Sequence, residues 1–190
     1  MPALRSGSNF VYLFHQRAIL IAVPVHSAHK GGRTMPGTAP RFICDSMLGR
    51  LAKNLRMLGF DTLYARPLSP QALMQTAFDQ QRIILSRRTV FSKNASTVSS
   101  VSIRSNAPEE QLREVMTACD ISGAVIRPFT ICLRCNAPLA DLAREAAAGR
   151  VPDYVLATVD HFAACPCCGR VYWKGTHYRN MADGILKNIA

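Results

Sequence analysis

The sequence predicts an α/β fold with a mainly parallel sheet flanked by helices, followed by a four-cysteine zinc ribbon. Apolar runs typical of strands alternate with helical segments between residues 41 and 127, which is the order of elements in a parallel sheet. Two Cys-x-x-Cys pairs then follow, and 29 residues separate them. We therefore divide the chain into a basic extension (1–40), an α/β domain (41–127), a zinc ribbon with a helical insert (128–181) and a tail (182–190).

Four segments of the α/β domain are expected to be its strands, and they are residues 41–44, 62–65, 82–86 and 99–104. The third segment is nearly all apolar. A strand that is covered on both faces needs apolar side chains in both directions, so we expect this strand near the centre of the sheet. The fourth segment alternates polar and apolar residues, as a half-exposed strand does.

Three helices are expected between and after these strands. Apolar residues recur at helical spacing from Met47 to Leu58, where Gly59 is suited to end the helix. Residues 70–79 form a second helical segment, and residues 108–116 form a third that begins with proline and two acids, as helix starts favour. Residues 140–149 are expected to form a helix inside the zinc ribbon.

The two cysteine pairs are expected to hold one structural zinc ion. Each pair presents two thiolates from one tight turn, and four sulfurs complete a tetrahedral site without an open position for catalysis. The alternatives are four unconnected thiols or two redox-active pairs. Cys167 lies inside the second pair and is expected not to bind the metal. The ligands are Cys132, Cys135, Cys165 and Cys168.

The positive charge is confined to one half of the chain. The net charge is +11, and residues 1–106 carry 14 Lys and Arg against three acids, whereas the remainder carries nine of each sign. This asymmetry predicts a polyanionic partner, which is most often nucleic acid, and the alternative is a basic surface that serves only solubility. The first 44 residues contain no acid, which is the composition of an organellar transit peptide, and they could also act as an anchoring arm. No membrane span is expected, because the apolar run 18–25 is too short.

Several segments together resemble one known family. Residues 42–61 look like the opening of the Mut-seven C-terminal ribonuclease domain, and the resemblance continues in residues 108–113, 132–139 and 165–178. It covers roughly residues 41–181 and leaves the extension unmatched. The resemblance implies a PIN-like fold in which a few carboxylates at the carboxyl ends of parallel strands hold Mg²⁺ or Mn²⁺ and cleave RNA.

The sequence departs from this family at the implied catalytic site. Asp45 matches the first metal-binding aspartate, but residues 66–70 lack the usual acids, and Ser86-Arg87-Arg88 stands where the family has Thr-Arg-Asp. One carboxylate rarely retains Mg²⁺, so Asp45 is a residual catalytic candidate that is insufficient alone. We expect a cleft that binds phosphate instead. Asp45 could also cap a helix that starts at Ser46 and form an ion pair with Arg88.

Basic side chains in two regions are the candidate contacts to RNA phosphates. Near the ribbon's cations lie Trp173 and Tyr178, and aromatic side chains beside cations suit single-stranded RNA. The alternative is that Tyr172 and Trp173 pack the ribbon against the α/β domain. The candidates are Arg50, Lys53, Arg56, Arg87 and Arg88 in the cleft, and Lys174 and Arg179 in the ribbon.

These observations predict a non-catalytic RNA-binding structural component of an organellar ribonucleoprotein. The best-fitting assembly is a mitochondrial ribosome, with ribosomal RNA and neighbouring proteins as partners. The first alternative is an active Mg²⁺- or Mn²⁺-dependent ribonuclease whose missing acids come from Asp61, Asp79 or a partner. The second is a protein-interaction subunit of a complex without RNA.

Overall fold

The computed structural model describes residues 39–64, 69–88, 91, 98–121, 125–176 and 178. All of them belong to one compact unit, Gly32–Ala190. The predictions for most of the basic extension and for the C-terminal tail fall outside the described residues, as does the expected RNA contact Arg179.

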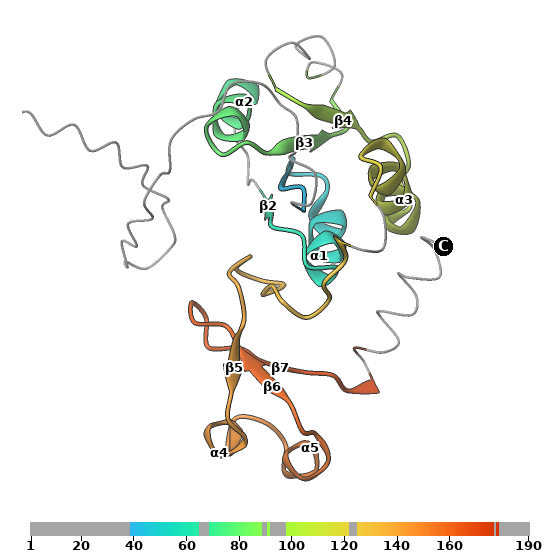
Figure 1. Cartoon of the computed structure of the whole chain (residues 1–190). Helices are drawn as coiled ribbons and strands as arrows, with labels where there is room; N and C mark the ends of the chain where they lie inside the picture. The colour runs from blue at the N-terminus through green and yellow to red at the C-terminus, as the bar shows by residue number, and fades with distance from the viewer. Residues whose placement is uncertain are drawn as a thin grey trace, which may run out of the picture. The chain divides into compact units, whose positions relative to one another are not determined.

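Four parallel strands form the sheet of the α/β domain (Figure 1). They are β1 (Phe42–Cys44), β2 (Thr62–Tyr64), β3 (Ile83–Ser86) and β4 (Ser100–Ser102), in the spatial order β2-β1-β3-β4. The predicted α/β class is confirmed, and β3 lies inside the sheet as expected. Because the chain turns from β1 toward β2 on one side and continues from β3 toward β4 on the other, the strand order reverses between β1 and β3. In open α/β sheets, ligands bind beyond the carboxyl ends of the strands at such a point.

Helices cover both faces of this sheet (Figure 1). The helices α1 (Gly49–Met57) and α3 (Pro108–Ala118) pack on the face that carries Phe42 and Cys44. The helix α2 (Pro70–Asp79) packs on the opposite face against Ile43. This alternation along β1 shows why the central strands are apolar in both directions. None of the helices in the described part of the chain is long and apolar enough to cross a membrane.

The ends of the first two helices show which local signals were reliable. The helix α2 has the predicted bounds, because Pro70 takes the first helical position and the Ser69 hydroxyl accepts a hydrogen bond from the Ala72 N–H. Gly59 follows α1 with a φ of 89°, and a Cβ there would lie 2.1 Å from the Arg127 carbonyl oxygen. Only glycine fits this position.

The predicted helix start at Ser46 is wrong. The helix α1 begins at Gly49 after Leu48, which provides no side-chain cap. Asp45 and Ser46 instead form a turn, in which the Leu48 N–H donates to the Asp45 carbonyl at 3.0 Å. The reason is that the Asp45 carboxylate is held by Ser86 at the end of β3 and by Arg88 after it.

A second, antiparallel sheet lies in the part that we call the cysteine module, residues 128–176 and 178. Its strands are β5 (Ala140–Leu142), β6 (Phe162–Ala164) and β7 (Val171–Trp173), in the order β5-β6-β7. Two short helices, α4 (Arg144–Ala147) and α5 (Asp153–Thr158), lie between β5 and β6.

The predicted helix over residues 140–149 is therefore only partly right. Its first three residues pair with β6 as a strand, and α4 spans only four residues. Pairing with β6 and packing onto a local core override the helical preference of the alanines. That core consists of Ala147, Val151, Val155 and Phe162, with Trp173 packed against it.

Candidate functional site

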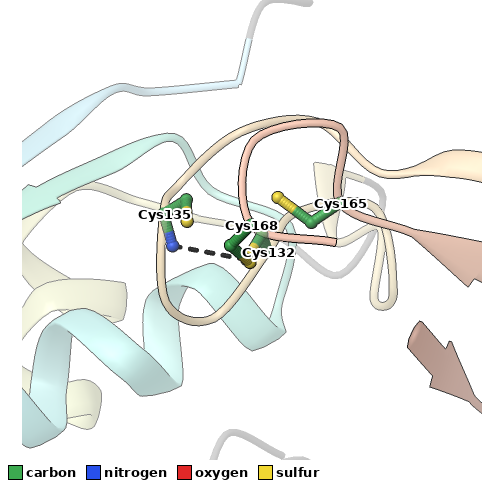
Figure 2. A group of neighbouring side chains, drawn as sticks. All are labelled: Cys132, Cys135, Cys165 and Cys168. Carbon is green, nitrogen blue, oxygen red and sulfur yellow. Dashed lines mark hydrogen bonds between the residues drawn. The ribbon is translucent and has the colours of Figure 1, made fainter. Parts of the chain in front are cut away.

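The four predicted cysteine ligands lie together. Their Sγ atoms are all within 4.8 Å of one another, and two loops present them toward a common point (Figure 2). The Sγ atoms of Cys132 and Cys168 are 3.8 Å apart. In a tetrahedral zinc site with Zn–S bonds of about 2.3 Å, the sulfurs are separated by about 3.8 Å. The donor set therefore fits a closed structural site that could hold a metal ion such as Zn²⁺.

Both cysteine pairs lie in turns of the same geometry. In the first turn the Asn136 N–H donates to the Cys132 carbonyl, and in the second the Gly169 N–H donates to the Cys165 carbonyl, both at 2.9 Å. Asn136 and Gly169 have φ angles of 63° and 70°. Asparagine and glycine are the residues that adopt this left-handed conformation most readily, so the residue after each pair shapes the turn.

The environment of Cys132 favours its thiolate. Burial raises the pKa of this thiol, but hydrogen bonds from the Tyr172 hydroxyl and from the backbone N–H groups of Cys135 and Arg134 outweigh it and lower the pKa to about 7. Burial raises the pKa of Cys165 to about 11. Because metals bind thiolates, Cys132, which is already partly ionised at neutral pH, loses its proton to a metal more readily than Cys165 does.

The first cysteine turn is fixed to the α/β domain by Arg56. Its Nε donates to the Thr62 carbonyl at 2.8 Å, and its Nη1 donates to the carbonyls of Leu133 and Arg134 at 3.0 and 3.1 Å. Arg56 is buried, with 8% of its surface exposed. We therefore remove Arg56 from the candidate RNA contacts, because its guanidinium serves to join two parts of the fold.

Asp61 joins the same two parts from the amino edge of the sheet. Its carboxylate accepts a bidentate pair of hydrogen bonds from Arg82 at 2.8 and 2.9 Å, one from Arg41 at 2.9 Å and one from the Asn136 amide. Burial raises the pKa of Asp61, but these hydrogen bonds and the charge of Arg82 outweigh it and hold the pKa below its usual value. Asp61 is therefore a structural carboxylate.

Asp61 and Asp79 lie at the wrong edge to complete a catalytic site with Asp45. Asp61 directly precedes β2, and Asp79 ends α2 shortly before β3. In a parallel sheet all strands begin at one edge and end at the other. Asp45 follows β1 and therefore lies at the opposite edge from both.

Asp45 is fully engaged at the carboxyl edge of the sheet. One carboxylate oxygen accepts from the Ser46 N–H at 2.7 Å, and the other accepts from the Ser86 hydroxyl at 2.8 Å and from Arg88 Nε at 3.0 Å. The expected ion pair with Arg88 is confirmed. Asp45 is also the single acid in residues 45–48, 65–69, 87–99 and 103–107, which follow the four strands. Glu114 of α3 also reaches the residues after β4, where its carboxylate accepts from the N–H groups of Arg104 and Ser105 at 2.8 and 2.9 Å. Both carboxylates are thus engaged by the protein, which does not fit Mg²⁺ or Mn²⁺, because those ions need several free oxygen ligands.

A shallow depression lies between α1, which contributes two cations, and α3, which contributes one acid. It is lined by Arg50, Lys53, Asn54 and Met57 from α1 and by Pro108 and Glu109 from α3. Arg50, Lys53 and Arg87 are exposed, and none of the three forms an ion pair within the described residues. Cations without partners on a concave surface favour the binding of an anion such as phosphate.

The ribbon aromatics occupy different environments. Trp173 packs against the core of the cysteine module, rather than between that module and the α/β domain. The Tyr172 hydroxyl lies 3.1 Å from Cys132 Sγ, and the Tyr172 ring meets the ring of Phe129. Lys174 is exposed beside Phe129. No periodicity or motif spacing singles out Phe129 in the sequence, because only the fold brings it to these residues.

Comparison with known families agrees with this architecture. A family model described as the Mut7-C RNAse domain matches residues 40–185, which include both sheets and all four clustered cysteines. Comparison with curated proteins and with solved structures gave no significant match. Since the family model covers most of the chain, the protein belongs to the Mut7-C RNAse domain family.

Proposed function

We propose that this protein binds RNA without cleaving it, as a structural component of an organellar ribonucleoprotein. Its family supports a function that involves RNA. The observation that carries the proposal is the ion pair between Asp45 and Arg88 at the carboxyl edge of the sheet. Hydrolysis of a phosphodiester by this route needs a metal ion that polarises the phosphate and activates water. Arg88 puts a fixed positive charge next to the carboxylate and would repel that ion.

Arg88, which stands where the family has an aspartate, also favours binding of the RNA backbone. The Arg88 side chain is 39% exposed, so its guanidinium reaches the surface while Nε is held by Asp45. Arg87 follows β3, and Arg50 lies in the first turn of α1, the helix that follows β1, so both lie toward the carboxyl edge of the sheet. Phosphate contacts of this kind position RNA without reading its sequence. The proposed contacts are Arg50, Lys53, Arg87 and Arg88, with Lys174 in the cysteine module and Arg179, which lies outside the described residues.

The assembly and its location belong to the same proposal. The acid-free first 44 residues and the charge of +11 support an organellar address and a polyanionic partner. A mitochondrial ribosome meets both conditions, and ribosomal RNA would then be the ligand. Sedimentation of the tagged protein from mitochondrial lysate tests this point. Comigration with a ribosome-sized particle that collapses on ribonuclease treatment is expected, and a slow peak that resists ribonuclease would contradict it.

Reversing the charge of Arg50 and Lys53 is expected to weaken RNA binding about tenfold or more. The double variant Arg50→Glu/Lys53→Glu removes two cations that have no partner within the described residues. If both contact phosphates of a single strand, the slope of log affinity against log salt becomes shallower by about 1.4. Fluorescence anisotropy with a labelled single-stranded RNA across a salt series measures both quantities.

The matched control reverses two cations of the cysteine module instead, Arg144 in α4 and Arg150 shortly after that helix. Arg144→Glu/Arg150→Glu changes the net charge by the same amount, and both arginines are exposed in the cysteine module. We expect this control to bind RNA nearly as the unaltered protein does. Equal losses in the two double variants would mean that net charge alone acts and that the depression between α1 and α3 is not a contact surface.

A further inference from the structure

An aromatic cluster with one cation lies beside the cysteine centre. The ring of Phe129 meets the ring of Tyr178 at a centroid distance of 5.5 Å and the ring of Tyr172 at 6.4 Å, both edge to face. Lys174 Nζ lies 6.0 Å from the Phe129 centroid. The three rings are half-buried and the lysine is exposed, so solvent reaches the cluster. A cluster that served only as core would be covered.

The backbone of Phe129 is strained. Its φ is 70°, in the left-handed region that bulky residues seldom adopt. The neighbouring turn is closed by the Thr130 hydroxyl, which donates to the Arg127 carbonyl at 2.8 Å. Glycine would fit this backbone without strain, so the phenyl ring is present despite the conformation and not because of it. Strain of this kind often marks a residue whose side chain has a function.

The cysteine centre holds this cluster in place. Tyr172 lies in β7, and its hydroxyl is 3.1 Å from the Sγ atom of Cys132. Its ring then contacts Phe129, which precedes the first cysteine pair. The two cysteine turns thus bring together rings from two distant segments, and the position of the rings depends on the closed centre.

We propose that Phe129, Tyr172 and Tyr178 form a stacking platform for an unpaired nucleobase, and that Lys174 binds an adjacent phosphate. The inference rests on the proposed RNA binding and names where a base is held. Half-exposed rings beside a cation suit single-stranded RNA, which offers a π face and a phosphate within one nucleotide. Lys174 lies at the outer limit of a cation–π contact, so a phosphate can draw its ammonium group away from the ring.

The test compares Phe129→Gly with the unaltered full-length protein. Glycine removes the ring but relieves the left-handed backbone, so the variant is expected to stay folded, as metal content and thermal unfolding will show. Affinity for a single-stranded RNA should fall about tenfold, because each stacked base contributes about five- to 150-fold. The salt dependence should stay unchanged, because stacking releases no counterions. Affinity for a duplex of the same sequence should also stay unchanged.

Three further variants complete the experiment. Tyr178→Ala should behave as Phe129→Gly does, and Phe129→Trp should keep nearly full affinity. Tyr154→Ala is the matched control, because Tyr154 is 72% exposed on α5, away from the cluster contacts. Unchanged single-strand affinity in Phe129→Gly and Tyr178→Ala, or an equal loss for the duplex, would overturn the platform while leaving RNA binding intact. If the unaltered protein binds neither RNA, the proposed function itself is overturned, and the platform with it.

Discussion

Replacing Cys132 by serine is expected to abolish metal binding and to unfold the cysteine module. A structural zinc site contributes to folding directly, with apparent binding free energies of about 10–16 kcal/mol in small zinc domains. The module has little else to hold it, since its strands have three residues each and its core contains four buried residues. Metal analysis together with near-UV circular dichroism, which reports the packing of Trp173 and the tyrosines, measures the effect.

Unfolding of the cysteine module is expected to destabilise the α/β domain as well. Arg56 donates to the carbonyls of Leu133 and Arg134, so an unfolded first turn leaves this buried guanidinium with fewer partners. The control is Cys167→Ser, which alters an exposed thiol inside the second pair and should retain both metal and fold. A Cys132→Ser protein that keeps its metal and its near-UV spectrum would show that the four sulfurs do not form a structural centre.

Replacing Asp61 by alanine is expected to lower the free energy of unfolding by about 3 kcal/mol. The change leaves the Arg82 guanidinium, whose side chain is only 4% exposed, without its bidentate partner. It also frees the Asn136 amide, which the first cysteine turn uses to contact the sheet. Urea denaturation measures the change in unfolding free energy.

Asp79→Ala is the matched control for this prediction. It removes the same charge from the exposed end of α2, where the carboxylate accepts a hydrogen bond from Gln75. Exposed substitutions of this kind cost about 0.5 kcal/mol or less. Equal destabilisation by the two variants would contradict a structural role for the Asp61 network.

The free energy of unfolding should also fall at low pH, because Asp61 becomes protonated. Its pKa is lower in the folded protein than in the unfolded chain, so the carboxylate contributes stability that is fully present above its unfolded pKa of about 4. That contribution is lost as the pH falls from about 4 through the folded pKa, because the unfolded chain then binds the proton more tightly. Unfolding curves between pH 7 and pH 2 should show a smaller loss for Asp61→Asn. Parallel pH profiles for the two proteins would contradict this assignment.

Local signals predicted much of the fold. Pro70 marked the start of α2, Gly59 marked the end of α1, and the spacing of the cysteines identified four residues that the fold then brings together. Each of these signals acts through neighbours in sequence. The apolar run of β3 was equally informative, because consecutive apolar residues in a strand indicate that both of its faces are buried.

Other features depend on contacts between distant residues. The start of α1 was missed because Asp45 bonds Ser86 and Arg88, about forty positions away, instead of capping the helix. Arg56 looked like a surface cation, but the carbonyls that it meets come from the first cysteine turn. The strand β5 and the helix α5 are short, and their identity is decided by pairing and by the local core. Phe129 could not be selected from the sequence, because its contacts with the rings of Tyr172 and Tyr178 are made only in the fold.

The measurement that tests the central claim most directly follows RNA binding and RNA integrity in the same reaction. The full-length protein is incubated with a labelled single-stranded RNA in Mg²⁺ or Mn²⁺, and bound fraction and strand length are read in parallel. We predict that the RNA is bound and remains as intact as in a chelator control, because Asp45 is held by Arg88 and no other acid occurs in the segments that follow the four strands. Metal-dependent cleavage that disappears in Asp45→Asn would contradict this account and would establish an active ribonuclease.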